Sequence, residues 1–188
     1  MKNYHLFSLG AIFLLFASCD KIKDATTVEI ETDLQVEIPI ATTGTSSATT
    51  KSAEANINAY QYGGTATFSL TDNEDISDYI DNIDDIIADG VASIQINGVP
   101  AGGSLNACLM KYGLAPTAGT TAFNLTTPLT SSNGTITVSD VAWINSLINT
   151  LKQNKKASYK FDVSGNASFD VNHVIKIKVP VIIKANPL

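Results

Sequence analysis

Apolar side chains occupy every second position along the segment 28–40, and this alternation constrains the fold more than any other feature of the chain. Only Thr32 interrupts the apolar series at the even positions. Because successive side chains of a β-strand point to opposite faces, a period of two predicts a long strand with one buried face. The segment 174–183 is so rich in β-branched residues that it predicts a central strand. Pro180 within it indicates a bulge or a strand edge.

Shorter strand patterns, separated by turn signals, fill much of the remaining chain. Gly63-Gly64 and Ser164-Gly165-Asn166 indicate a turn or bulge within two of them. The link 98–104 contains three glycines, but Ser104 stands where a phosphate-binding loop requires Lys. We therefore interpret this link as a flexible hairpin connection. The candidate strands are 59–70, 91–96, 105–112, 121–129 and 159–171.

The spacing of apolar residues changes from two to three or four in two segments. Five isoleucines and Tyr79 in the segment 74–89 recur at intervals of three and four, which predicts an amphipathic helix that ends at Gly90. The segment 140–152 shows the same spacing and follows a capping Ser139-Asp140 pair, which predicts a second helix. Taken together, the patterns predict a mainly β fold, an antiparallel β-sandwich with two amphipathic helices at about 74–89 and 140–152.

The N-terminus carries the pattern of a bacterial lipoprotein signal. Lys2 precedes the apolar stretch 6–16, and Ala17-Ser18-Cys19 follows it. A permanent membrane span needs about 20 apolar residues, so this stretch is too short to remain as an anchor. We predict that residues 1–18 are removed and that Cys19 is lipidated, which holds the chain on a membrane. The alternative is an ordinary secretory signal that happens to end near a cysteine.

The length of the chain after Cys19 favours one domain. Residues 19–26 have the composition of a short tether. Residues 27–188 are then a single β-sandwich-like domain. Within it, the segment 41–55 is rich in Thr, Ser and Ala and has no large apolar residue, which predicts a low-complexity loop.

The charge balance excludes several classes of partner. The chain has no arginine and a formal net charge of −6, and removing the signal takes away only Lys2. An acidic domain without arginine is poorly suited to nucleic acid. Eight acidic residues between 72 and 89 carry no base among them. We interpret them as the solvated face of the predicted helix, because a calcium loop needs oxygens at alternate positions around a glycine.

Few side chains remain that could support catalysis. After removal of the signal the one histidine is His173, which we expect in a solvated turn. With Cys19 lipidated, Cys108 has no disulfide partner, and its apolar neighbours predict a buried, unreactive thiol. One histidine and one cysteine are too few for a usual zinc site. We therefore predict no catalytic residues, no metal and no cofactor, and a hydrolase is the least favoured class.

Four sequence blocks resemble lipoproteins of the Bacteroidota that have no known activity. They are the Cys-Asp-Lys start and the segments 68–86, 147–168 and 184–188. The stretch from Leu147 through 163–181 is also similar to the end of the LEA-14/WHy β-sandwich. In this bacterial group, charged residues after the cysteine can direct export to the cell surface, and Asp20-Lys21-Ile22-Lys23-Asp24 is a partial match. The resemblance implies an outer-membrane location and leaves the facing side open.

Two functions fit these observations. The first is a membrane-anchored, non-enzymatic binding or structural module of the cell envelope, with an unidentified protein or glycan as its partner. The alternative is a carrier of a small apolar ligand or lipid, in which the predicted helix 74–89 forms a lid.

Overall fold

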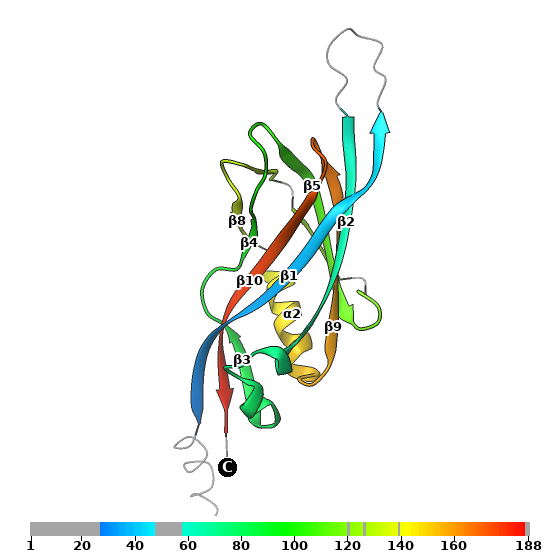
Figure 1. Cartoon of the computed structure of the whole chain (residues 1–188). Helices are drawn as coiled ribbons and strands as arrows, with labels where there is room; N and C mark the ends of the chain where they lie inside the picture. The colour runs from blue at the N-terminus through cyan, green and yellow to red at the C-terminus, as the bar shows by residue number, and fades with distance from the viewer. Residues whose placement is uncertain (1–26, 48–57, 120, 126, 139, 187–188) are drawn as a thin grey trace, which may run out of the picture.

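A computed structural model describes residues 27–47, 58–119, 121–125, 127–138 and 140–186 (Figure 1). The predicted signal, Cys19 and the tether lie outside the described residues.

One antiparallel sheet of ten strands curls over on itself, so that β1 and β10 cross in front of β2, β5 and β9 (Figure 1). The mainly β, sandwich-like fold is confirmed. The strand order is β6-β5-β9-β2-β1-β10-β4-β8, with β3 also paired to β10 and β7 to β5. The strands are β1 Val28–Ser47, β2 Asn58–Ser69, β3 Ile83–Ala88, β4 Ser93–Ile96, β5 Ser104–Leu114, β6 Thr121–Leu125, β7 Leu129–Thr130, β8 Thr135–Thr137, β9 Ser158–Ala167 and β10 Asn172–Ala185.

The alternating segment forms β1 as predicted. From Leu34 to Ile40 the even-numbered side chains are buried and the odd-numbered ones are exposed. The strand pairs with β10 from Val28 to Ala41 and with β2 from Ile40 to Ser47. Its buried face meets the odd-numbered side chains of β10, which are buried from Ile175 onward. These two strands supply one wall of the hydrophobic core.

Pro180 lies where β10 changes its neighbour. On the side away from β1, β10 pairs with β4 at residues 175–178 and with β3 at residues 181–185. The carbonyl of Pro180 points to that side, because it accepts a hydrogen bond from the N–H of Asp89 at 2.9 Å. The nitrogen of a strand residue points the same way as its carbonyl, so the missing N–H falls in the gap between β4 and β3.

The prediction of a helix at 74–89 is wrong. The segment contains the 3-10 helix η2, Ser77–Asn82, followed by strand β3, and a shorter 3-10 helix, η1, Leu70–Asp72, precedes it. Ile80, Ile83 and Ile86 are still buried. A 3-10 turn repeats every three residues, and the register shift at Asp84 brings Ile83 and Ile86 of β3 to the same face. Pairing with β10 stabilises the strand, whereas a helix would bring like charges together at intervals of three and four residues.

The helix predicted at 140–152 is confirmed as α2, Val141–Gln153. The carboxylate of Asp140 accepts a hydrogen bond from the backbone N–H of Trp143 at 2.9 Å and caps the first turn. The helix contacts β3 and β6, and Lys152 forms an ion pair with Asp85 on β3 at 2.5 Å. Its buried residues are Trp143, Ile144, Leu147, Ile148 and Leu151.

The predicted loop at 41–55 is a strand in its first part. β1 continues to Ser47 and pairs with β2 across a register shift between Thr42 and Gly44, so only 48–55 lies outside the described residues. Threonine favours strands, and pairing with the backbone of β2 does not require a large apolar side chain. Lack of core-forming residues therefore did not imply a lack of regular structure.

Two further turn predictions are corrected by the strand pairing. The segment 164–166 is continuous strand, because β9 pairs with β2 and β5 on its two sides there. The link 98–104 is not a hairpin, because β4 pairs with β10 and β8 while β5 pairs with β6, β7 and β9. It carries the chain from one half of the curled sheet to the other.

Candidate functional site

The strands β1 and β2 separate at Ile40 and Gly64 and leave a fork between them (Figure 1). Beyond this point β2 continues alongside β9, and β1 continues alongside β10. Gly64 allows the close crossing, since a Cβ atom there would lie 2.1 Å from the carbonyl oxygen of Pro39. Among the described residues, no strand pairs with the segment 28–39 of β1 on its fork side.

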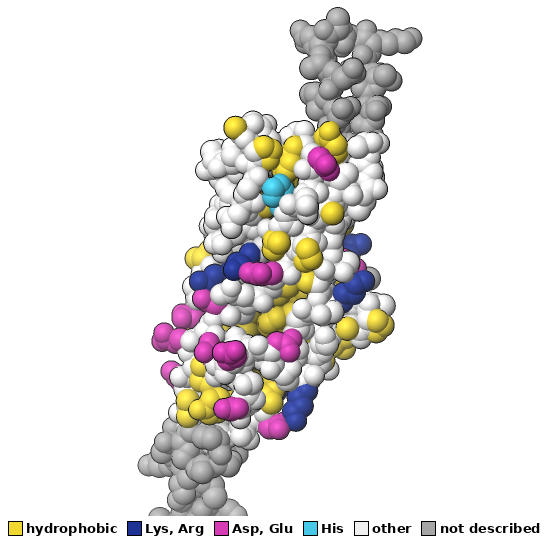
Figure 2. Space-filling view, in the orientation of Figure 1, with side chains coloured by type: hydrophobic (Ala, Val, Ile, Leu, Met, Phe, Trp, Pro, Cys, Tyr) yellow, Lys and Arg dark blue, Asp and Glu magenta, His cyan; other side chains and the backbone are white. Residues whose placement is uncertain are grey.

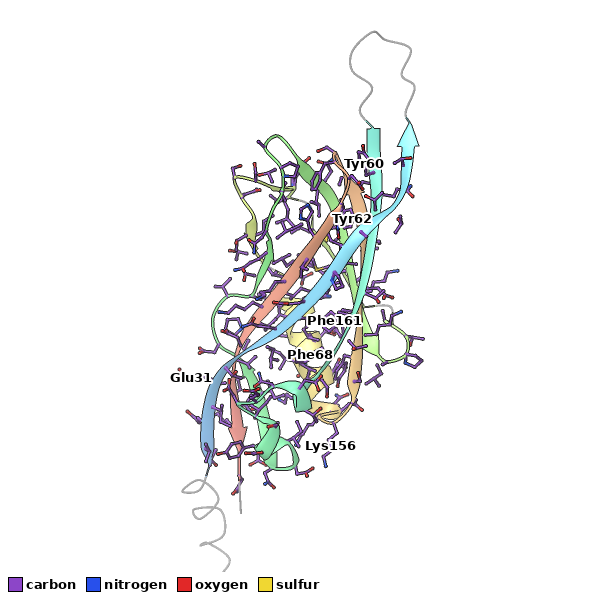
Figure 3. All side chains as sticks on the ribbon, viewed as in Figure 1. Glu31, Tyr60, Tyr62, Phe68, Lys156 and Phe161 are labelled. Atoms are coloured by element: carbon purple, nitrogen blue, oxygen red, sulfur yellow. The ribbon has the colours of Figure 1, made fainter. Side chains whose placement is uncertain are left out.

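The fork contains an open hollow of ≈ 490 Å³. Figure 3 labels Glu31 on β1 and Phe68 on β2, and both residues line the hollow. Acidic side chains gather over the half of this face nearest the start of β1 (Figure 2). Four acids, two amides, one hydroxyl and one aromatic ring line the hollow: Glu31, Thr32, Asp33, Gln35, Phe68, Asp72, Asn73 and Asp75.

Thr32, which interrupts the apolar alternation of β1, ties one wall of the hollow to the sheet. Its hydroxyl donates a hydrogen bond to the Asp75 carboxylate at 2.7 Å and accepts one from the Asn73 amide at 3.4 Å. The side chain of Asn73 in turn accepts a bond from the backbone N–H of Asp75 at 2.9 Å. The polar residue on the inner face therefore orders the connection between η1 and η2.

Lysines of β10 neutralise some of the acids on the exposed face of β1. Lys176 pairs with Glu37 at 2.7 Å, Lys178 with Asp33 at 2.7 Å and Lys184 with Glu29 at 2.8 Å. The hydrogen bond from Lys184 to Glu29 raises the pKa of this lysine.

Glu31 lacks such a partner. It lies opposite Ile182 and forms no ion pair with any described residue. Asp72 and Asp75 are likewise without an ion pair within the described part of the chain. The hollow therefore carries uncompensated negative charge in a position open to solvent.

The acidic run 72–89 is solvated, but it does not form one helix face. Asp72 and Asp75 reach the hollow, whereas Asp81 pairs with Lys156 and Asp85 with Lys152. The hydrogen bond from Lys152 lowers the pKa of Asp85. No group of three or more His, Cys, Asp or Glu side chains able to hold a metal ion occurs among the described residues.

The buried position predicted for Cys108 is confirmed. Burial raises the pKa of its thiol to about 11, and burial also raises the pKa of the neighbouring Tyr62. His173 does not lie in a turn, because it is a residue of β10 paired with Ile40, and its ring contacts Phe169 with 5.5 Å between ring centroids. Neither Cys108 nor His173 lines the hollow.

Sequence reasoning missed Glu31, Asp33 and Gln35 as residues of a common site. The signal was present, since the odd positions of the alternating segment carry acids and an amide. What it did not show was the divergence of β1 and β2, which leaves these residues beside an open strand edge. As to membrane spans, no described helix combines the length and the apolar character needed to cross a bilayer.

Comparison with known proteins identifies no family. No family model and no curated protein sequence matches the chain. Among solved structures, a chain of Desmodium yellow mottle tymovirus is similar over 86% of this chain and 90% of its own, with 12% identity and a TM-score of 0.37. A chain of turnip yellow mosaic virus is similar over 84% of this chain and 96% of its own, with 7% identity and a TM-score of 0.33.

Proposed function

We propose that the protein is a lipid-anchored, non-enzymatic binding module of the cell envelope and that the acidic fork between β1 and β2 is its binding surface. The observation that carries the proposal is the open hollow, whose acids Glu31, Asp72 and Asp75 have no ion pair among the described residues. Unpaired charge of one sign at an open surface favours a partner of the opposite sign.

The proposed lipid would hold the start of β1 near the membrane. β1 begins at Val28, nine residues after Cys19, and an extended chain spans at most about 3.3–3.6 Å per residue. The start of β1 would therefore lie within about 30 Å of the membrane surface. The end of β10 lies beside it, and the far ends of β1 and β2 project from the opposite end of the domain (Figure 1). The fork then opens on the flank of the domain.

Metabolic labelling tests the anchor. Cells that make the protein receive a palmitate analogue that carries an alkyne. We expect the wild-type chain to take up the label and to stay with the membrane fraction, and Cys19→Ser to do neither. Label on the Cys19→Ser variant, or wild-type protein that is released without detergent, would contradict the lipid anchor.

Site-specific photocrosslinking tests the binding surface. A photoreactive amino acid replaces the exposed Gln35, which lines the hollow. The matched control carries the same amino acid at Asp84, which is exposed and does not line it. We expect a discrete crosslinked species in living cells from position 35 and none from position 84. Equal crosslinking from both positions, or from 84 alone, would contradict the proposed surface.

The carrier function loses the lid on which it depended. Ile76, Ile80 and Ile83 are buried in the hydrophobic core, and the segment forms a short 3-10 helix and a strand instead of one long helix. The described hollow is lined mainly by polar side chains, which suits an apolar ligand poorly. Native mass spectrometry of the purified protein tests this alternative, because a carrier would retain bound lipid.

A further inference from the structure

The backbone of β1 offers an unpaired edge to the fork. The N–H of Thr42 bonds to the carbonyl of Val171 beside β10, so even-numbered residues of β1 point toward β10. Odd-numbered residues must then point toward the fork, because backbone groups alternate along a strand. The carbonyl of Pro39, an odd-numbered residue, agrees with this alternation, since it points toward Gly64 on β2. The pair Asp33–Pro180 agrees as well, because Pro180 directs its carbonyl away from β1.

The open edge thus consists of the N–H and C=O groups of Glu31, Asp33, Gln35 and Glu37. No described backbone group bonds to them from the fork side. The connection 72–75 approaches β1 through side chains only, by way of Thr32. A strand edge of this kind is a template for a further strand.

The side chains around this edge determine which strand it can accept. Of the three acids among these residues, Asp33 and Glu37 pair with lysines of β10, and Glu31 has no ion pair among the described residues. Asp72 and Asp75 also lack an ion pair within the described part of the chain and add further negative charge to the hollow. A second copy of this acidic chain would place acids opposite acids, which is destabilising across a sheet. A strand with alternating lysine or arginine would instead place its cations beside Glu31 and its neighbours.

We propose that the fork binds an extended, basic peptide segment of a partner protein, which adds to the edge of β1 as a strand. This inference rests on the proposed binding function and names the class of partner. The backbone of the peptide would exchange hydrogen bonds with Glu31, Asp33, Gln35 and Glu37. Its outward side chains would be cationic, and its inward side chains would be apolar and would lie toward Phe68, the one aromatic residue that lines the hollow.

Calorimetric titration with synthetic peptides tests the proposal on the purified wild-type domain. The probe is Lys-Val-Lys-Val-Lys-Val-Lys, acetylated and amidated at its ends. One control has Glu in place of Lys. Two others are methylated on the backbone nitrogens of alternate residues, one on each of the two registers. We expect the probe to bind and the Glu control not to bind. N-methylation on the register that faces β1 should weaken binding about a hundredfold, because about three hydrogen bonds of about 1 kcal/mol each are lost.

Variants of the protein locate the contact. Gln35→Pro removes one fork-facing N–H without affecting the bonds to β10, and Gln35→Ala retains that N–H. We expect about fivefold weaker binding for the proline variant and no change for the alanine variant. Glu31→Lys should weaken binding about tenfold, whereas Asp84→Lys, with the same change of charge, should alter it less than about twofold.

Two results would overturn the proposal. Equal binding of the N-methylated peptides on both registers would show charge attraction without strand pairing, and an absence of binding to the lysine probe would show that no basic strand fits. Should Gln35→Pro fail to fold, the methylated peptides on wild-type protein still decide the question. Crosslinking of a partner from position 35 combined with failure of the basic peptide would leave the binding function standing and remove this inference alone.

Discussion

Replacing Thr32 by valine tests whether this residue ties the wall of the hollow to β1. Valine preserves the size of the side chain but removes the hydroxyl that donates to Asp75 at 2.7 Å and accepts from Asn73 at 3.4 Å. A hydrogen bond to a charged group contributes about 1.5–3 kcal/mol, but this one is exposed, and the bond from Asn73 is long. We therefore expect the free energy of unfolding to fall by about 1 kcal/mol.

The assay is denaturant unfolding followed by the fluorescence of Trp143, the only tryptophan in the chain. This residue is buried and packs against Tyr112 and Phe123, so its emission reports the loss of the core. A fall of about 1 kcal/mol in the free energy of unfolding would lower Tm by roughly 2–4 °C in a domain of this size. The double variant Thr32→Val/Asp75→Asn should lose no more free energy of unfolding than Thr32→Val alone. Unchanged or greater stability of Thr32→Val would refute the reasoning, because the inner-face hydroxyl would then be replaceable by an apolar group at no cost.

Three further predictions concern other parts of the fold. Asp140→Ala should lower the free energy of unfolding by about 0.5–2 kcal/mol, because α2 loses its cap. The control is Asp170→Ala, at an exposed position in the connection between β9 and β10, which should leave the free energy of unfolding unchanged. Because burial raises the pKa of Cys108 to about 11, its thiol should react with iodoacetamide at pH 8 only as fast as the domain unfolds, and rapid reaction in the native state would contradict its burial. The pKa of Asp85 is lowered, so its bond to Lys152 stabilises the fold above the ordinary pKa of 3.8 and is lost as pH falls through the lower folded-state value. The stability difference between wild type and Asp85→Asn should therefore be largest near neutral pH and should shrink in acid, and a difference that stays constant in acid would contradict this role.

The strands with the clearest pattern were predicted from sequence because one physical cause dominates them. Alternation along β1 reflects a single buried face, and the β-branched run of β10 reflects a strand with neighbours on both sides. The helix α2 was predictable for the same reason, since its cap and its apolar stripe agree. Local pattern and tertiary environment point to the same structure in these three elements.

The segment 74–89 shows where such reasoning fails. Its isoleucines fit a helix, but they equally fit a 3-10 turn followed by a strand. Pairing with residues 181–185 of β10 favours the strand, and this pairing cannot be read from the sequence of the segment itself. The strand at 41–47 was missed for a related reason, because it pairs through its backbone and contributes little to the core.

The candidate site was predictable only in part. The solvated character of the acidic run and the buried thiol of Cys108 followed from the sequence. The hollow did not, because it combines β1 residues with Asp72 and Asp75 from about 40 positions further along the chain. The sequence showed Thr32 as an exception to the alternation. The structure explains the polar residue at this position by its hydrogen bond to Asp75.

Hydrogen exchange of the β1 amides measures the central claim, that this strand presents an open edge able to accept another strand. In the free protein, the N–H groups of Leu34, Val36 and Ile38 face β10 and should exchange slowly, whereas those of Asp33, Gln35 and Glu37 face the fork and should exchange fast. Addition of the alternating lysine–valine peptide should slow the second set and leave the first unchanged. Slow exchange of both sets in the free protein, or fast exchange of the second set with saturating peptide, would contradict the account.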